Sequence, residues 1–66
     1  MKLITPIEFN NLRLPENISV KVYEACIDMF IGGKSIIDAC EAREIKEDWE
    51  IRDLSNAIES IIKQLE

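Results

Sequence analysis

Histidine is absent from this chain of 66 residues, and cysteine, glycine and proline occur only twice each. Without an imidazole, the chain lacks the most frequent general base and the most frequent metal ligand of proteins. The two isolated cysteines match no zinc spacing, and neither a glycine-rich phosphate-binding loop nor a nucleophile elbow is present. These absences predict a protein that is not an enzyme and that uses no metal or cofactor.

Long apolar runs and an excess of positive charge are missing as well. No segment approaches the roughly 20 apolar residues that span a bilayer, and the first residues lack the apolar run of a signal peptide. The net charge of −5 argues against non-specific binding to phosphate backbones or anionic membranes, although one basic face could still contact DNA specifically. We therefore expect a cytoplasmic protein without a membrane partner, in which Cys26 and Cys40 are reduced and buried.

The length of the chain limits its core. A chain this short buries only about 60% of its unfolded surface, so it depends on dense apolar packing or on a partner. We expect one helical domain over residues 1–66, which completes its core as a homodimer.

Two helices are predicted in the first half of the chain. Thr5-Pro6-Ile7-Glu8 has the form of a capping box and predicts a short helix over residues 6–12, with Ile7 or Phe9 and Leu12 facing inward. A second helix is predicted over residues 17–31, because apolar residues recur there at helical spacing. Its inward stripe is Ile18, Val22, Ala25, Cys26, Met29 and Phe30.

Two further helices are predicted in the second half. One residue of Gly32-Gly33 can take the left-handed conformation that ends a helix, and Ser35 can cap a helix over residues 36–43. We expect that helix to bury Ile36 or Ile37 together with Cys40. The last helix is predicted over residues 48–65, with an apolar stripe of Ile51, Leu54, Ile58, Ile61, Ile62 and Leu65 and an opposite face of Arg52, Asn56, Glu59 and Lys63. No segment has the sequence pattern of a strand, so the predicted fold class is all-α.

The order of these signals is that of a helix-turn-helix at about residues 35–65, without a wing. Cys40 is the small residue that lets the second helix of such a motif cross closely, and Ile45 is the apolar residue of the turn. Glu44 stands where glycine is most frequent, and the segment up to Leu54 is longer than in the compact motif. The alternative interpretation is a helical hairpin with no role in DNA binding.

Several short motifs are shared with known regulators. The stretch from Ile31 to Glu41, with its Gly-Gly, Lys, Ser cap and Cys-Glu, resembles PapB-type fimbrial regulators. The wider pattern is similar to KorA/TrfB-type plasmid repressors, on the evidence of Ile4-Thr5, Phe9, Gly33-Lys34 and Leu54-Ser55-Asn56-Ala57-Ile58. The resemblance covers most of the chain from about Ile4. It implies a small helical, often oligomeric DNA-binding transcriptional regulator of the kind linked to mobile elements.

The resemblance also implies which residues contact double-stranded DNA. Ser55 and Asn56 would lie at the base edges with Arg52 beside them, and asparagine can bond bidentately to adenine. The helix N-terminus at Ser35 is suited to a phosphate. The other expected phosphate contacts are Lys34, Arg43 and Lys46.

The segment before Leu54 supports a second interpretation. It carries Glu47, Asp48, Glu50 and Asp53, which would repel phosphates if they faced a duplex, whereas solvated carboxylates suit a helix N-terminus. The lone tryptophan, Trp49, either packs at the edge of the core or anchors a protein interface. The alternative function is a small acidic helical module that inhibits or antagonises a nucleic-acid-binding protein, with Glu47, Trp49 and Glu50 meeting a basic surface of that protein.

Overall fold

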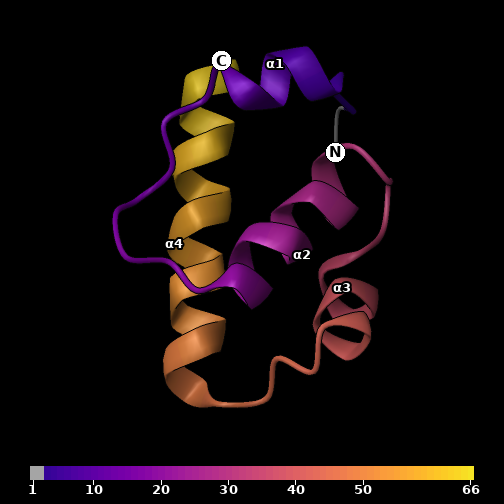
Figure 1. Cartoon of the computed structure of the whole chain (residues 1–66), viewed down its shortest axis with the longest axis vertical. Helices are drawn as coiled ribbons and strands as arrows, with labels where there is room; N and C mark the ends of the chain where they lie inside the picture. Colours follow the sequence, from indigo (N-terminus) through magenta and orange to yellow (C-terminus); the bar gives the residue numbers. More distant parts are fainter. Residues whose placement is uncertain (1–2) are drawn as a thin grey trace.

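The computed structural model describes residues 3–66, and every regular element within them is an α-helix (Figure 1). The helices are α1 (Pro6–Asn10), α2 (Val20–Phe30), α3 (Ile36–Ala42) and α4 (Asp48–Leu65). The predicted all-α class is confirmed. The bounds of α4 agree with the prediction, whereas the other three helices are slightly shorter than predicted. No helix in residues 3–66 combines the length and the apolar character needed to cross a membrane.

Three of the four helices begin at a side-chain cap. The hydroxyl of Thr5 accepts from the Glu8 backbone N–H at 3.2 Å, and the Glu8 carboxylate accepts from the Thr5 N–H at 3.0 Å, which completes the predicted capping box. Ser19 and Ser35 cap α2 and α3 through equivalent bonds of 3.2 Å. The residue before α4, Glu47, makes no side-chain capping bond.

Backbone conformation fixes both ends of α2. Asn17 adopts a left-handed φ of 64°, so the helix starts at Val20, later than predicted. At the other end, Gly33 supplies the predicted left-handed residue with φ of 77°. Gly32 is needed for space, because a Cβ there would lie 2.8 Å from the Asp28 carbonyl oxygen.

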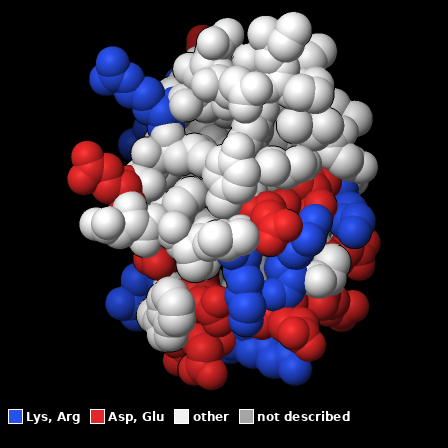
Figure 2. Space-filling model, viewed as in Figure 1, with Lys and Arg blue, Asp and Glu red and all other residues white. Residues whose placement is uncertain are grey.

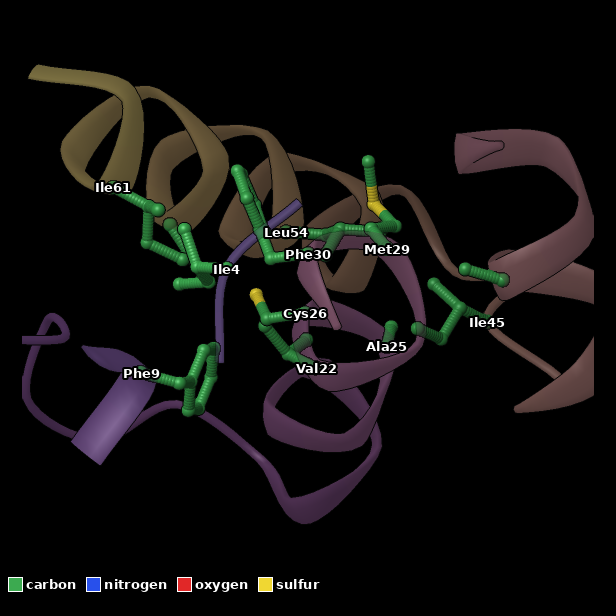
Figure 3. Packing of buried hydrophobic residues seen from close by; sticks show 12 residues of the cluster. Ile4, Phe9, Val22, Ala25, Cys26, Met29, Phe30, Ile45, Leu54 and Ile61 are labelled. Carbon is green, nitrogen blue, oxygen red and sulfur yellow. The ribbon is translucent and has the colours of Figure 1, made fainter. Parts of the chain in front are cut away.

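The core is centred on α2, which packs against both α4 and α3 (Figure 1). Figure 3 shows side chains from α2, α4 and the N-terminal segment converging on one cluster. The N-terminal segment is tied to α2 by the Ile4 N–H, which donates to the Phe30 carbonyl at 2.9 Å. The buried apolar residues are Ile4, Phe9, Val22, Ala25, Cys26, Met29, Phe30, Ala39, Ile45, Leu54, Ala57 and Ile61.

The inward stripe predicted for α2 is confirmed, apart from Ile18, which is only half-buried. In α1, Phe9 is the buried residue and Ile7 is exposed. Phe9 also meets the ring of Tyr23 edge-on, with centroids 5.7 Å apart. Both cysteines are free thiols: Cys26 is buried, which raises its pKa to about 11, and Cys40 is half-buried.

The prediction for α3 is wrong in part. Ile36 and Ile37 are both exposed, at 40% and 68%, and Ala39 is the residue that is fully buried. The reason is that α3 makes its main helix contact with α2. The small side chain of Ala39 faces this contact and allows the two backbones to approach closely. The isoleucines of α3 are therefore left on the sides away from α2.

The stripe of α4 also differs from the prediction. Its buried residues are Glu50, Leu54, Ala57 and Ile61, which recur at intervals of four, three and four. Ile51 and Ile62 remain 40% and 42% exposed, because they lie one position further round the helix than this stripe. The apolar surface of α4 is thus wider than the part that α2 covers.

Candidate nucleic-acid interface

The outer side of α4 carries the residues that the sequence places at base edges. Arg52, Ser55 and Asn56 are all exposed, because α4 rests on α2 through the opposite side. Glu59 and Lys63 continue this side and form an exposed ion pair with nitrogen and oxygen 3.8 Å apart. The structure therefore brings the three predicted base-reading residues together on one solvent-facing surface.

The turn before α4 has a defined helix-ending geometry. The Glu44 N–H donates to the Glu41 carbonyl at 3.3 Å, and the Ile45 N–H donates to the Cys40 carbonyl at 2.9 Å. These two bonds have the Schellman pattern, and Glu44 has the left-handed φ of 54° that this pattern requires. Ile45 is 4% exposed, so it anchors the turn in the core. This left-handed residue stands at the position of a helix-turn-helix where glycine is most frequent.

The lengthened segment between Ile45 and Leu54 is helical from Asp48 onward. Because α4 begins at Asp48, Arg52 lies in its second turn, and Ser55 and Asn56 lie in its third. The N-cap Glu47 and the first-turn residues Asp48 and Trp49 instead present exposed side chains. The N-terminal tip of α4 is consequently acidic and carries one large aromatic ring.

Arg43, a predicted phosphate contact, instead bonds to two carboxylates of α2. Its Nε and Nη2 donate to the two carboxylate oxygens of Asp28 at 2.8 and 2.9 Å, and its Nη1 donates to Glu24 at 3.3 Å. These bonds hold the pKa of Asp28 below its ordinary value and raise that of Arg43. The side chain thus ties the end of α3 to α2. No local sequence pattern indicates this contact, because its partners lie 15 and 19 residues away.

The other predicted phosphate contacts lie in the segments before and after α3. Ser35 is exposed and its hydroxyl already accepts the capping bond from Asp38 at 3.2 Å, while Lys34 precedes it along the chain. Lys46 follows α3 along the chain, in the segment before α4. Lys34, Lys46 and Arg52 have no ion pair within 4 Å among residues 3–66. On the face drawn in Figure 2, acidic and basic groups alternate and form no unbroken positive strip.

The residues predicted for the alternative protein interface do not share one surface. Glu47 and Trp49 are exposed, Trp49 at 56%, but Glu50 is only 5% exposed. The carboxylate of Glu50 lies 3.9 Å from the ammonium of Lys21, which also donates to the Glu44 carbonyl at 3.3 Å. Glu50 therefore fastens the start of α4 to α2 and does not share the surface of Glu47 and Trp49.

Sequence reasoning missed an open apolar groove between α3 and α4. One hollow of about 400 Å³ is lined by Ile36 of α3 and by residues of α4 that include Ser55, Ile58 and Ile62. A second hollow of about 350 Å³ also contains Ile36 and continues past Ile37, Cys40, Ile45 and Ile51. The available signal was the width of the apolar pattern of α4, which exceeds one helix face.

Comparison with protein-family models, with curated proteins and with solved structures gives no match to this chain.

Proposed function

We propose that this protein is a DNA-binding transcriptional regulator of the helix-turn-helix class. The observation that carries the proposal is the outer side of α4, where Arg52, Ser55 and Asn56 are exposed together on a helix that α2 supports from behind. The left-handed turn at Glu44 adds support, because it joins α3 to α4 through the backbone conformation that helix-turn-helix units favour.

In this proposal α4 enters the major groove and α2 and α3 form its scaffold. The Asn56 amide bonds bidentately to an adenine, and the Arg52 guanidinium reaches an adjacent base or phosphate. Lys34 and Lys46, which are exposed and have no ion pair within 4 Å among residues 3–66, provide phosphate contacts. The acidic tip of α4 repels phosphates, so affinity depends on base contacts more than on charge.

The test is binding of fluorescent duplexes from the region upstream of the coding sequence, at low and at moderate salt. A double variant, Arg52→Ala with Asn56→Ala, should weaken specific binding at least tenfold, since one bidentate contact is worth about 1–3 kcal/mol. Asn10→Ala, which removes an exposed amide from α1, should leave binding unchanged. If no duplex is bound even at low salt, where phosphate contacts are strongest, the proposal is overturned.

A second candidate function is supported by the tip of α4. Trp49 is more than half exposed beside Glu47 and Asp48, which is a suitable anchor for the basic surface of another protein. In this case the chain acts as an inhibitor or antagonist of a nucleic-acid-binding protein. Loss of biological activity in Trp49→Ala or Glu47→Lys, with Arg52→Ala and Asn56→Ala silent, would favour this function over DNA binding.

A further inference from the structure

Two stripes run along α4 with the same spacing. The buried stripe, Glu50, Leu54, Ala57 and Ile61, faces α2. Ile51, Ser55, Ile58 and Ile62 repeat the intervals of four, three and four one residue later, and we name these four residues the second stripe. This spacing is that of alternating heptad positions, the pattern by which one helix packs along another.

The second stripe is open to solvent. Ile51 and Ile62 are 40% and 42% exposed, Ser55 is exposed, and Ile58 is half-buried. Ile36 and Ile37 of α3 border it, and the hollows between α3 and α4 run beside it. Three isoleucines and the small residue Ser55 form a surface on which another helix can pack, because a small residue lets a second helix approach closely.

We propose that a second copy of this chain packs on the second stripe, with the two α4 helices antiparallel about a two-fold axis. When the second stripe is reversed onto itself, Ile51 lies opposite Ile62 of the second copy and Ser55 lies opposite Ile58. Large residues thus meet large ones at the ends, and the small residue accepts a large one near the centre. The sequence of the stripe is therefore complementary to its own reverse.

The charges beside the stripe favour the same arrangement. Arg52 and Glu59 each follow a stripe residue and lie on one flank of α4. Reversal brings Arg52 of each copy near Glu59 of the other, which gives two reciprocal ion pairs. Among residues 3–66 of one copy, Arg52 has no ion pair within 4 Å, and the carboxylate of Glu59 meets Lys63 alone, at 3.8 Å.

A small dimer needs only part of the exposed surface of the chain. A stable interface buries roughly 800 Å² per partner, about a sixth of the 4604 Å² exposed by the chain. α4 is about 27 Å long over its 18 residues, and α3 widens its apolar side. A chain of this size also gains from a partner, because it buries a small share of its own surface.

This inference does not rest on DNA binding. Two packed helices lie about 10 Å apart, whereas half-sites one helical turn apart are separated by about 34 Å. The antiparallel pair would also cover Ser55 and place Arg52 in an ion pair with Glu59 of the other copy, so that Asn56 alone would remain for base contacts. The dimer is therefore a separate state from a pair of subunits that reads two half-sites.

Sedimentation equilibrium over a wide range of protein concentration tests the proposal. The wild-type chain should approach twice its 7.6 kDa mass as its concentration rises. Ile62→Glu should stay monomeric, because it places a carboxylate opposite Ile51. Ile7→Glu is the matched control, since it alters an isoleucine that is 75% exposed on α1, outside the second stripe. A monomer at every concentration overturns the proposal, and so does a dimer that Ile62→Glu leaves intact.

A charge exchange distinguishes the antiparallel pair from other dimers. Arg52→Glu should raise the dimer Kd about tenfold, because it turns two attractive contacts into repulsive ones. The double variant Arg52→Glu with Glu59→Arg should restore the wild-type Kd. Circular dichroism of each variant verifies that the helices are intact, so loss of the dimer is not loss of the fold. Failure of the double variant to restore association, with its helices intact, overturns the arrangement.

Discussion

α2 and α3 are both apolar helices that follow a serine cap, yet they are buried to very different extents. α2 buries five of its 11 residues, whereas α3 buries one of its seven. The difference follows from their positions, because α2 has α4 on one side and α3 on another, while α3 packs mainly on α2 (Figure 1). The isoleucines of α3 are as hydrophobic as the core residues of α2, but no helix among residues 3–66 covers them fully.

This contrast separates what maintains the fold from what is available to a partner. The α2–α4 contact contains the largest fully buried side chains, including Phe30 and Leu54. α3 is held by Ala39, by Ile45 in the turn that follows and by the bonds from Arg43 to α2. We expect changes in α2 to affect stability, and changes on the exposed side of α3 to affect association.

The largest expected effect comes from truncating the core of α2. Phe30 is 1% exposed, so Phe30→Ala should cost about 3–5 kcal/mol of unfolding free energy, through lost burial and the cavity that remains. A domain of this size has little more stability than that, so the variant should be largely unfolded. Urea denaturation followed by circular dichroism provides the measurement.

Ile37→Ala is the matched change in α3. Its side chain is 68% exposed, so at protein concentrations where the chain is monomeric the cost should stay within about 0.5 kcal/mol. Equal costs for Phe30→Ala and Ile37→Ala would show that α3 belongs to the core and that the contrast between the two helices is wrong.

A smaller effect is expected at the ends of the same two helices. Both ends use a left-handed residue, but α2 uses Gly33 and α3 uses Glu44. A non-glycine residue in this conformation costs roughly 1–2 kcal/mol, part of which is offset by the greater freedom of glycine in the unfolded chain. Glu44→Gly should therefore stabilise the protein by up to about 1 kcal/mol, and Gly33→Ala should destabilise it by about the same amount.

Thermal unfolding measures both variants. For a domain of 60–100 residues, 1 kcal/mol corresponds to a change in Tm of about 4–8 °C, so two shifts of opposite sign should be resolved. Shifts of the same sign would mean that the two helix ends do not share the backbone conformation described here.

The local parts of the fold were predictable from sequence, whereas its long-range pairings were not. The Thr5 capping box, the Ser35 cap and the bounds of α4 depend on residues within one turn of each other, and all three are confirmed. The burial of Glu50 depends on Lys21, 29 positions earlier, and therefore leaves no local pattern. Periodicity likewise shows that a helix has an apolar side, but not whether another helix covers it.

In the candidate site, too, local features were predictable from sequence and long-range contacts were not. The exposure of Arg52 and Asn56 follows from their place opposite the apolar stripe, and it was predicted from helical spacing. Arg43 was assigned to phosphate contact by resemblance, yet its guanidinium faces Asp28 and Glu24 of α2. No spacing within α3 indicates these partners, because they belong to a helix that only folding brings alongside.

The smallest expected effect comes from the Arg43–Asp28 contact that attaches α3 to α2. Arg43 holds the pKa of Asp28 below its ordinary value in the folded chain, mainly through hydrogen bonding. The stabilisation is complete above the unfolded pKa of an aspartate, near 3.9, and is lost as pH falls through the lowered folded pKa. The effect is modest, because the Arg43 side chain is 33% exposed and solvent screens the pair.

Replacing Asp28 by asparagine keeps its shape and removes this titration. Asp28→Asn should have a lower Tm than the wild type at neutral pH, and the difference should shrink as the pH falls below about 4. Glu16→Asn, which removes an exposed carboxylate from the loop before α2, should instead follow the wild-type pH profile. A difference in Tm between Asp28→Asn and the wild type that stays constant down to pH values well below 4 would mean that the carboxylate charge contributes nothing. The attachment of α3 would then depend on Ala39 and Ile45 alone, and the contrast with α2 would be one of packing and not of charge.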